Sequence, residues 1–251
     1  MEIFYLYISV DTWLVPVYYD QTDWSVGFFW SQQASVILKD TFYNLNEEKK
    51  KRVIDATLEE FALSGYEKTS LDTIISRAGI SKGGLYEYIE SKEDLFRYAL
   101  TYSYNELYVY INKRVESQAM RMPADPLERT RFISSVAVDF YIENPDIIAF
   151  IVNSSQTGQA SIRKHVQEVF DSYFSKLYES SSYQRIVYES DQVLSLLKWL
   201  LVKTRDDFQK NMNTNGKSAA CKELYLAEWK FFLSVLSNGI YDGEFVSSVL
   251  K

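Results

Sequence analysis

Helix-start signals crowd into residues 46–92 of this 251-residue chain, and they constrain its fold more than any other feature. Thr69 begins a Thr-x-x-Asp capping pattern, Ser91 begins a Ser-x-x-Asp pattern, and Ser81 between them can cap a short helix. Helices that start this close together are short, so each must bury its apolar face against its neighbours. The spacing therefore predicts a compact three-helix unit, followed by a long connecting helix over about 92–115.

The first helix of this unit is visible in its apolar periodicity. Apolar residues recur at i, i+4, i+7 and i+8 over about 46–64, and Gly65 follows as a stop signal. The residues of this stripe are Ile54, Leu58, Phe61 and Ala62. The chain has only 4 prolines and 9 glycines, which argues against a turn-dense β-sandwich and favours long helices.

The second and third helices have the features of a helix-turn-helix. Gly79 permits a left-handed backbone at the tight turn between them, and Ile80 buries that turn. Apolar residues face inward from both helices: Leu71, Ile74, Ile75, Ala78 and Leu85. Such a unit projects the third helix outward, where its N-terminal residues can enter a DNA major groove about 12 Å wide.

The third helix carries the side chains that this geometry would bring to DNA. Lys82 can reach a base edge or a phosphate. Tyr86, one turn on, can place its hydroxyl against a phosphate, and Tyr88 likewise. Gly83 and Gly84 cost about 1 kcal/mol each inside a helix, and we expect them to let the backbone approach DNA closely.

Helix starts supply the other predicted contacts, because helix N-termini combine unpaired N–H groups with the positive end of the helix dipole. Thr69 and Ser70 lie at the start of the second helix, and Lys92 lies at the start of the fourth. The predicted DNA-binding residues are Thr69, Ser70, Ser81, Lys82, Gly83, Gly84, Tyr86, Tyr88 and Lys92.

Residues 47–97, and above all the run from Thr69 to Leu95, resemble the DNA-binding domain of the TetR/AcrR family of transcriptional regulators. The turn, the glycines, the tyrosine and the Ser-Lys-Glu start are all in register with that family. The resemblance implies an all-helical homodimer that binds a palindromic operator, usually as a repressor, and releases it when a small ligand enters the C-terminal domain. It also implies DNA contacts, mostly to phosphates, for Thr69, Ser70, Lys82, Tyr86 and Lys92.

Three positions depart from the family's pattern. Ile75 stands where the family usually has alanine, at the close approach of the two motif helices, and Ile89 replaces a usual phenylalanine. Glu87 puts an acid on or near the reading face, where it could accept a hydrogen bond from a cytosine amine or point to solvent. These departures concern the details of base reading rather than DNA binding itself.

The first 45 residues differ in composition from the rest. They are rich in aromatic and β-branched residues and hold one base, Lys39, against five acids. Two interpretations stay open: a poorly ordered extension, or translation that begins nearer residue 40. We therefore expect an all-α fold in three parts: an atypical extension over 1–45, the helix-turn-helix domain over 46–92, and a larger helical effector-binding and dimerisation domain over 93–251.

Further helices are expected near 126–143, 145–155, 159–180, 183–210 and 217–239. The last two are apolar on more than one face, so they must be buried in a core or against a partner. We predict a homodimer through about 186–240. Aromatic residues at helical spacing usually form the core, but some could line a cavity for a small organic effector. The candidate cavity residues are Phe140, Phe150, Phe170 and Phe174.

Charge and rare residues limit the function classes. The net charge is −7, but DNA binding depends on cations gathered on one face, so the overall balance decides little. The single cysteine, Cys221, cannot form an internal disulfide, and the single histidine argues against a zinc centre. We therefore expect a cytoplasmic protein without a metal or other cofactor. Without a catalytic constellation or a run of about 20 apolar residues, neither an enzyme nor a membrane protein is expected.

The sequence thus predicts a ligand-responsive, dimeric DNA-binding regulator. Its expected partners are double-stranded operator DNA and a small organic effector. The alternative is a helical protein-interaction adaptor that keeps the fold but no longer reads DNA, supported by the acidic balance and by Glu87.

Overall fold

The computed structural model describes residues 6–10, 13–17, 38–117, 121–215 and 219–240. The chain divides into two compact units, Met1–Val36 and Ile37–Lys251. The first unit holds a two-stranded antiparallel sheet, made of β1 (Leu6–Val10) and β2 (Trp13–Val17). Both segments are rich in the β-branched and aromatic residues that favour strands. The other residues of this unit lie outside the described ranges, and so does the expectation that they are poorly ordered.

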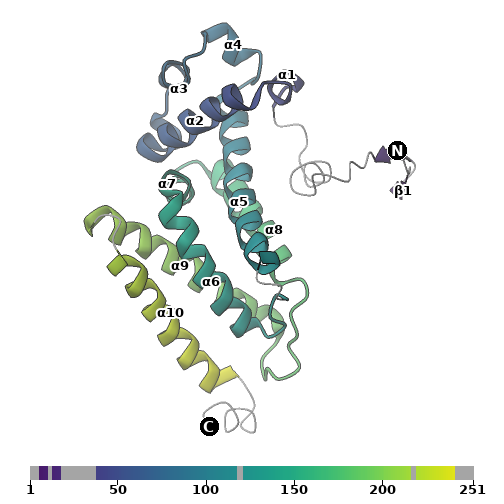
Figure 1. The fold of residues 1–251 in the computed structure, drawn as a ribbon, viewed down its shortest axis with the longest axis vertical. Coiled ribbons are helices and arrows are strands. Elements are labelled where there is room, and N and C mark those ends of the chain that lie inside the picture. Colours follow the sequence, from purple (N-terminus) through teal and green to yellow (C-terminus); the bar gives the residue numbers. More distant parts are fainter. Residues whose placement is uncertain (1–5, 11–12, 18–37, 118–120, 216–218, 241–251) are drawn as a thin grey trace. The chain divides into compact units, whose positions relative to one another are not determined.

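Every regular element in the described part of the second unit is a helix, as expected for the all-α class (Figure 1). In chain order the helices are α1 (Asp40–Tyr43), α2 (Glu47–Lys68), α3 (Leu71–Ala78), α4 (Lys82–Tyr86), α5 (Lys92–Ser117), α6 (Pro126–Glu143), α7 (Pro145–Ser154), α8 (Ala160–Tyr178), α9 (Ser190–Asn215) and α10 (Ala219–Ile240). The helix expected from about 183 begins only at Ser190. Among the described residues, no helix is both long enough and apolar enough to cross a membrane.

Two of the predicted helix starts have the side-chain caps that their sequences indicate. At the start of α5, the Asp94 carboxylate accepts a hydrogen bond from the Ser91 amide at 2.9 Å, and the Asp94 amide donates to the Ser91 hydroxyl at 3.2 Å. At the start of α4, the Ser81 hydroxyl accepts from the Gly84 amide at 3.0 Å. These bonds satisfy amides that have no partner inside the helix.

The second unit begins earlier than the composition suggested. Leu38 and Phe42 have 1% and 0% of their surface exposed, and the Phe42 ring packs edge-on against Tyr98 with centroids 5.1 Å apart. The predicted boundary between residues 45 and 46 is therefore wrong, because α1 and the residues before it belong to the helical unit. Two buried side chains hardly change the composition of a 45-residue segment, so its composition does not reveal them.

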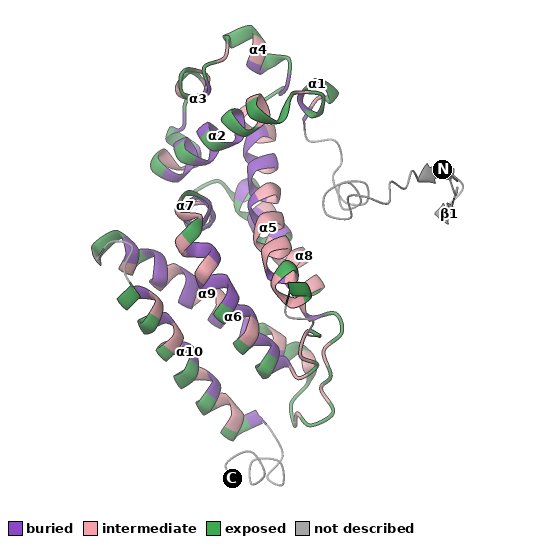
Figure 2. Cartoon of the chain, in the orientation of Figure 1, coloured by how far each residue is buried: buried purple, intermediate pink, exposed green. Residues whose placement is uncertain are grey.

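An aromatic cluster joins α2, α5 and α7 into one core. The Phe61 ring lies 5.1 Å from Phe96 and 5.8 Å from Phe150, centroid to centroid, and Tyr66 lies 5.0 Å from Phe96. All four side chains are buried, and Figure 2 shows buried stretches on α2, α5 and α7. Such pairs add to the free energy gained by burial. The helix-turn-helix part and the rest of the helical chain were expected as separate domains, but they form a single compact unit.

The remaining helices build the larger part of this unit. α10 packs against α6 and α9, and α8 packs against α5. The start of α6 is fixed by Asp125, whose carboxylate accepts hydrogen bonds from the amides of Leu127 at 2.9 Å and Glu128 at 3.0 Å. Pro126 and Pro145 occupy the first positions of α6 and α7, where a missing N–H costs nothing.

Candidate nucleic-acid interface

α3 and α4 form the predicted helix-turn-helix. Gly79 ends α3 with φ 63° and ψ 39°, the left-handed conformation that the tight turn requires. Ile74, Ala78 and Leu85 have at most 1% of their surface exposed, so the two helices rest on the core through these side chains. This anchoring fixes the opposite side of α4 at the surface.

The leading edge of α4 faces solvent. Ser81, Lys82 and Gly83 are exposed, and Tyr86 has 43% of its surface exposed. A Cβ atom at Gly83 would meet nothing within 4 Å, whereas one at Gly84 would lie 3.1 Å from the Ser81 hydroxyl that caps the helix. Glycine at 84 therefore protects the cap, while no contact with the part of the chain that the structure describes explains the glycine at 83.

Lys82 is paired across the motif with Asp72 of α3. The ammonium lies 3.0 Å from the carboxylate, and this contact raises the pKa of Lys82. Both side chains are about two-thirds exposed, with 66% and 70% of their surface accessible. An exposed pair of this kind contributes little to stability, so an incoming phosphate could displace Asp72 at little cost.

Two predicted DNA contacts are wrong because their side chains are buried. Thr69 is only 5% exposed, and its hydroxyl donates to the Gly65 carbonyl at 2.6 Å. The predicted Thr-x-x-Asp capping box at Thr69 consequently does not form, and Ser70 is the N-cap residue of α3. Tyr88 is 4% exposed, with its ring 6.1 Å from that of Phe42.

Ser70 and Lys92 lie close together at the junction of α2, α3 and α5. Ser70 is exposed, and its side chain makes no capping hydrogen bond. The Lys92 ammonium donates to the carbonyls of Tyr66 at 2.8 Å and Thr69 at 3.2 Å, and it lies 4.8 Å from the centre of the Tyr66 ring. Lys92 therefore caps the end of α2, so its predicted role as a phosphate contact would require these bonds to break.

Sequence reasoning missed the contact of the α1 segment with α4. The Lys39 amide donates to the Tyr88 carbonyl at 2.8 Å, and the Lys39 ammonium donates to the Tyr86 carbonyl at 3.0 Å. The Thr41 hydroxyl donates to the Glu87 carbonyl. One signal could have pointed there, since Lys39 is the only base among the first 45 residues.

Glu67, at the end of α2, ties the helix-turn-helix part to the loop between α7 and α8. Its carboxylate accepts hydrogen bonds from the Thr157 hydroxyl at 2.6 Å and the Gly158 amide at 2.9 Å. The Thr157 bond is the main reason that the pKa of Glu67 is lowered from its ordinary value of 4.5. A second tie lies one turn earlier, where the Asn153 amide of α7 donates to the Ala62 carbonyl at 2.5 Å.

We expect Glu67→Gln to lower the free energy of unfolding by about 0.5 kcal/mol at neutral pH, a small value because this carboxylate is largely exposed. The pKa of the Glu67 carboxylate is lower in the folded state than its ordinary value of 4.5, so the carboxylate stabilises the folded state above pH 4.5. This stabilisation is lost as the pH falls through the pKa of the folded state. Urea unfolding at pH 7 and pH 3.5 measures the difference, which should shrink at the lower pH. Glu116→Gln, on the exposed end of α5, is the control, and an equal difference at both pH values would contradict the expectation.

Of the four predicted cavity residues, only Phe174 lines either of the two pockets found among the described residues. Phe150 is fully buried in the aromatic core, and Phe140 is 3% exposed with its ring 5.3 Å from Tyr110. Both pack against other aromatic rings, and neither lines the two pockets described below, so their assignment to a cavity stays a prediction. Phe170 and Phe174 are neighbours on α8, 6.0 Å apart.

Phe174 does line a pocket, between the end of α8 and the start of α9. The pocket has a volume of about 440 Å³. Its wall combines aromatic and hydroxyl groups with two carboxylates and a lysine: Phe174, Ser175, Tyr178, Glu179, Tyr183, Ser190, Asp191, Leu194, Ser195 and Lys198. Lys198 lies 5.2 Å above the Phe174 ring and is paired with Asp171 at 2.7 Å.

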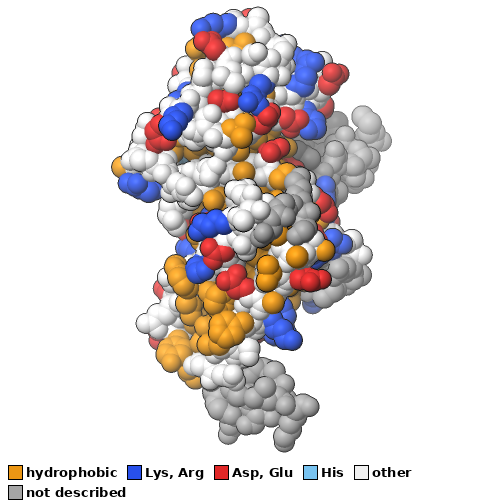
Figure 3. Space-filling view, turned by 90° about the vertical axis from the view of Figure 1, so that its left-hand side faces the viewer, with side chains coloured by type: hydrophobic (Ala, Val, Ile, Leu, Met, Phe, Trp, Pro, Cys, Tyr) orange, Lys and Arg blue, Asp and Glu red, His pale blue; other side chains and the backbone are white. Residues whose placement is uncertain are grey.

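The outer faces of α9 and α10 carry an exposed apolar patch (Figure 3). Trp199 on α9 is 58% exposed, and Phe231 on α10 is 63% exposed. The other exposed apolar residues of the two helices follow at helical spacing from these two, so they lie on the same helix faces. Together they are Leu196, Trp199, Leu224, Phe231 and Val235, a set that we call the α9–α10 patch. The two helices were expected to be apolar on more than one face, and this is confirmed, since Leu197, Leu200 and Trp229 are buried on the inner side.

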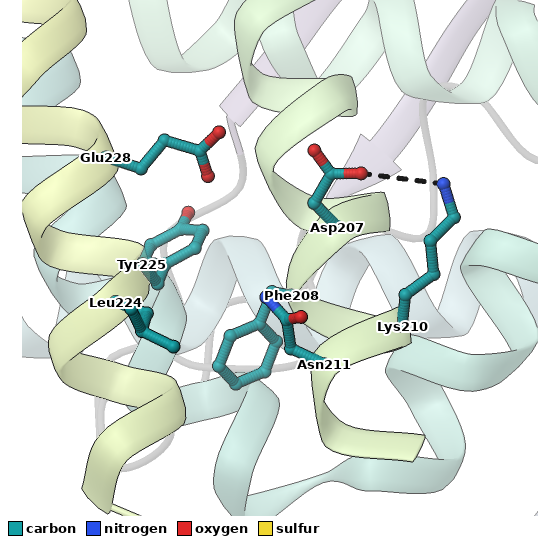
Figure 4. A pocket seen from close by; sticks show the side chains of 7 residues that line it. All are labelled: Asp207, Phe208, Lys210, Asn211, Leu224, Tyr225 and Glu228. Carbon is teal, nitrogen blue, oxygen red and sulfur yellow. Dashed lines mark hydrogen bonds and ion pairs between the residues drawn. The ribbon is translucent and has the colours of Figure 1, made fainter. Parts of the chain in front are cut away.

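A second pocket opens between α9 and α10 (Figure 4). Its volume is about 390 Å³, and it is lined by Asp207, Phe208, Lys210, Asn211, Leu224, Tyr225 and Glu228. Lys203 lies within ion-pair distance of both Asp207 and Glu228. Partial burial raises the pKa of Glu228. Because Leu224 belongs both to this pocket and to the α9–α10 patch, the pocket opens on the same face.

Residues 53–99 match the family model described as bacterial regulatory proteins, tetR family. Among curated relatives, the HTH-type transcriptional repressor KstR of Rhodococcus jostii RHA1 is 28% identical over 131 residues, which are 52% of this chain and 58% of that protein. The uncharacterized HTH-type transcriptional regulator YuxN of Bacillus subtilis 168 is 40% identical over 65 residues, 26% of this chain and 22% of that protein. The chain thus spans just over half of the first relative and about a fifth of the second.

Solved structures share the fold over most of the helical chain. A TetR family transcriptional regulator from Chloroflexus aurantiacus J-10-fl superposes with a TM-score of 0.59 at 21% identity, covering 82% of this chain and 99% of that one. The regulator FadR from Bacillus subtilis, solved in complex with stearoyl-CoA, has a TM-score of 0.56 at 14% identity, covering 73% and 97%. The matched residues 53–99 contain the exposed helix α4 and the turn at Gly79 that positions it. Residues 53–99 therefore carry a domain of the tetR family of bacterial regulatory proteins, and the helical chain shares the fold of solved TetR family regulators.

Proposed function

We propose that the chain is a DNA-binding repressor that reads a palindromic operator as a homodimer. The observation that carries this proposal is the Lys82–Tyr86 edge of α4, which faces solvent while Leu85 anchors the same helix in the core. An exposed helix edge of this kind fits a major groove. Curated relatives named as repressors support the direction of regulation.

The α9–α10 patch is the surface through which we propose that two copies pair. Soluble monomers rarely leave side chains such as Trp199 and Phe231 uncovered on one contiguous patch. A twofold axis through this patch buries the same residues from both copies, as a closed dimer requires. It also gives the complex two reading helices, which multiplies the discrimination of one half-site.

The proposed effector is a small organic molecule that binds in the larger part of the helical unit. The pocket between α8 and α9 supports this, because it offers Phe174 and Tyr178 as apolar surface beside several hydroxyl groups. The FadR structure with stearoyl-CoA shows that one neighbour in this fold takes an acyl ligand. α5 runs from the helix-turn-helix part to the contact with α8, so it is the element through which effector binding would move α4.

The test is a series of gel shifts with duplexes from the region upstream of the protein's own gene. We expect Lys82→Met to weaken binding about ten-fold at low salt and to lower the salt slope by about 1, because one phosphate contact is lost. Tyr86→Phe should weaken all sequences alike by about five-fold without changing the salt slope, because only a neutral hydroxyl is removed. Lys164→Met, at an exposed position of α8, is the charge control.

Failure of the wild-type chain to bind any of these duplexes in a salt-dependent way would overturn the proposal. Light scattering with the same duplexes separates a DNA-binding dimer from an adaptor, since an adaptor would leave the DNA free. Binding in which Lys82→Met behaves like Lys164→Met would place the DNA contact elsewhere than on α4.

A further inference from the structure

α4 is too short to hold its own conformation. It has five residues, and two of them are glycines, each of which costs about 1 kcal/mol relative to alanine in a helix interior. Isolated helices shorter than about 12 residues are marginal even with favourable sequences. Contacts from outside the helix must therefore fix the direction in which its exposed edge points.

The start and the middle of α4 are held by contacts within the motif. The Ser81 hydroxyl caps its first turn, and Leu85 fixes its inner side in the core. The last carbonyls of a helix have no partner inside it, so the end of α4 needs donors from elsewhere. Two of these carbonyls belong to Tyr86 and Glu87, and the next one along the chain belongs to Tyr88.

The segment around α1 supplies a donor to each of these three consecutive carbonyls. The Lys39 ammonium lies 3.0 Å from the Tyr86 oxygen, the Thr41 hydroxyl donates to the Glu87 oxygen, and the Lys39 amide lies 2.8 Å from the Tyr88 oxygen. The positive charge of Lys39 also complements the negative end of the helix. The three bonds link residues 46 or more positions apart in the chain, so they are tertiary rather than local contacts.

The donors are themselves held in place. Phe42 has no exposed surface and packs against Tyr88 and Tyr98, and Leu38 is 1% exposed. These two buried side chains flank Lys39 and Thr41 in the sequence and anchor α1 to the core. The donors of Lys39 and Thr41 are therefore held in fixed positions next to the end of α4.

We propose that Lys39 and Thr41 are positioning residues of the reading helix: they hold the end of α4 and so set the angle at which its edge meets the operator. This inference rests on the proposed function, in which α4 reads DNA. It assigns to the segment before α2 a part in sequence discrimination that does not need contact with the DNA.

Thr41→Val tests the inference, because it removes one hydroxyl without changing charge or size. Thr41 is exposed, so the variant should fold. We expect its affinity for the operator to fall about five-fold, the loss of one neutral hydrogen bond, while its affinity for non-specific duplex and its salt slope stay unchanged. Thr41→Ser keeps the hydroxyl and should restore operator binding. Thr214→Val, at an exposed position of α9, is the matched control.

Lys39→Met separates positioning from direct contact with DNA. A positioning role predicts lower operator affinity with an unchanged salt slope, whereas loss of a phosphate contact would lower the slope by about 1. A lowered slope, with non-specific binding weakened equally, would overturn the assignment of Lys39.

Hydrogen exchange without DNA keeps this test independent of the proposed function. The amides of Leu85, Glu87 and Tyr88 are hydrogen-bonded around α4. We expect them to exchange faster in Thr41→Val than in the wild type or in Thr214→Val, with little change in the global unfolding temperature. Unchanged exchange would overturn the inference even if the protein binds DNA. If exchange is faster in Thr41→Val but the protein binds no DNA, the proposed function is overturned, whereas the positioning of α4 by Lys39 and Thr41 is supported.

Discussion

A chain carrying both Trp199→Glu and Phe231→Glu is expected to be monomeric and to bind a palindromic operator at least about 100-fold more weakly than the wild type. Both side chains are largely exposed in the single copy, and the substitutions place two carboxylates in the middle of the α9–α10 patch. Linking two half-site readers converts the second binding event into an intramolecular one, which is worth about 10²-fold or more. Analytical ultracentrifugation and gel shifts measure the two effects on the same preparations.

The control for this pair is Ser161→Glu with Gln167→Glu, which adds the same two charges to the exposed side of α8. It should stay dimeric and keep its operator affinity, apart from a small effect of net charge. A dimeric Trp199→Glu, Phe231→Glu variant would mean that two copies pair through another surface.

Phe150→Ala is expected to lower the free energy of unfolding by about 3–5 kcal/mol, the usual loss for a fully buried phenylalanine. The ring has no exposed surface and contacts Phe61 and Phe96 in the cluster that joins α2, α5 and α7. Urea unfolding of the full chain measures the loss. Phe150→Leu, which keeps most of the volume, should cost less than half as much.

The same experiment decides between two assignments of Phe150. The sequence suggested a cavity residue, and removal of a cavity wall would cost little stability while changing the response to an effector. A loss below about 1 kcal/mol would therefore contradict the core assignment.

Local signals predicted the helices well because they depend on neighbouring residues. The Ser-x-x-Asp pattern at Ser91 forms a complete capping box, and Ser81 caps α4 as expected. The Thr69 pattern failed although its residue types were suitable. Gly65 breaks the helical backbone inside α2 with φ 69°, and its carbonyl then lies within reach of the Thr69 hydroxyl, so that bond replaces the cap.

The faces of side chains were less predictable, because partners distant in the sequence decide them. Tyr88 is close in sequence to Tyr86, and both were expected to contact DNA. Phe42, which approaches Tyr88 from a segment that composition had separated from the fold, covers Tyr88 and leaves Tyr86 exposed. The same limit applies to Phe140 and Phe150, since apolar spacing shows that a residue is buried but not whether it faces a packed core or a cavity.

The aromatic cluster has a consequence for engineering chimeric regulators. Phe61 and Tyr66 belong to the helix-turn-helix part, whereas Phe150 belongs to α7, and Phe96 lies between them on α5. Grafting only residues 38–91 onto a foreign body would leave half of this cluster facing water. A transplant that preserves stability must carry the first turns of α5 and a matching α7, so the helix-turn-helix part of this chain cannot be exchanged at a simple boundary.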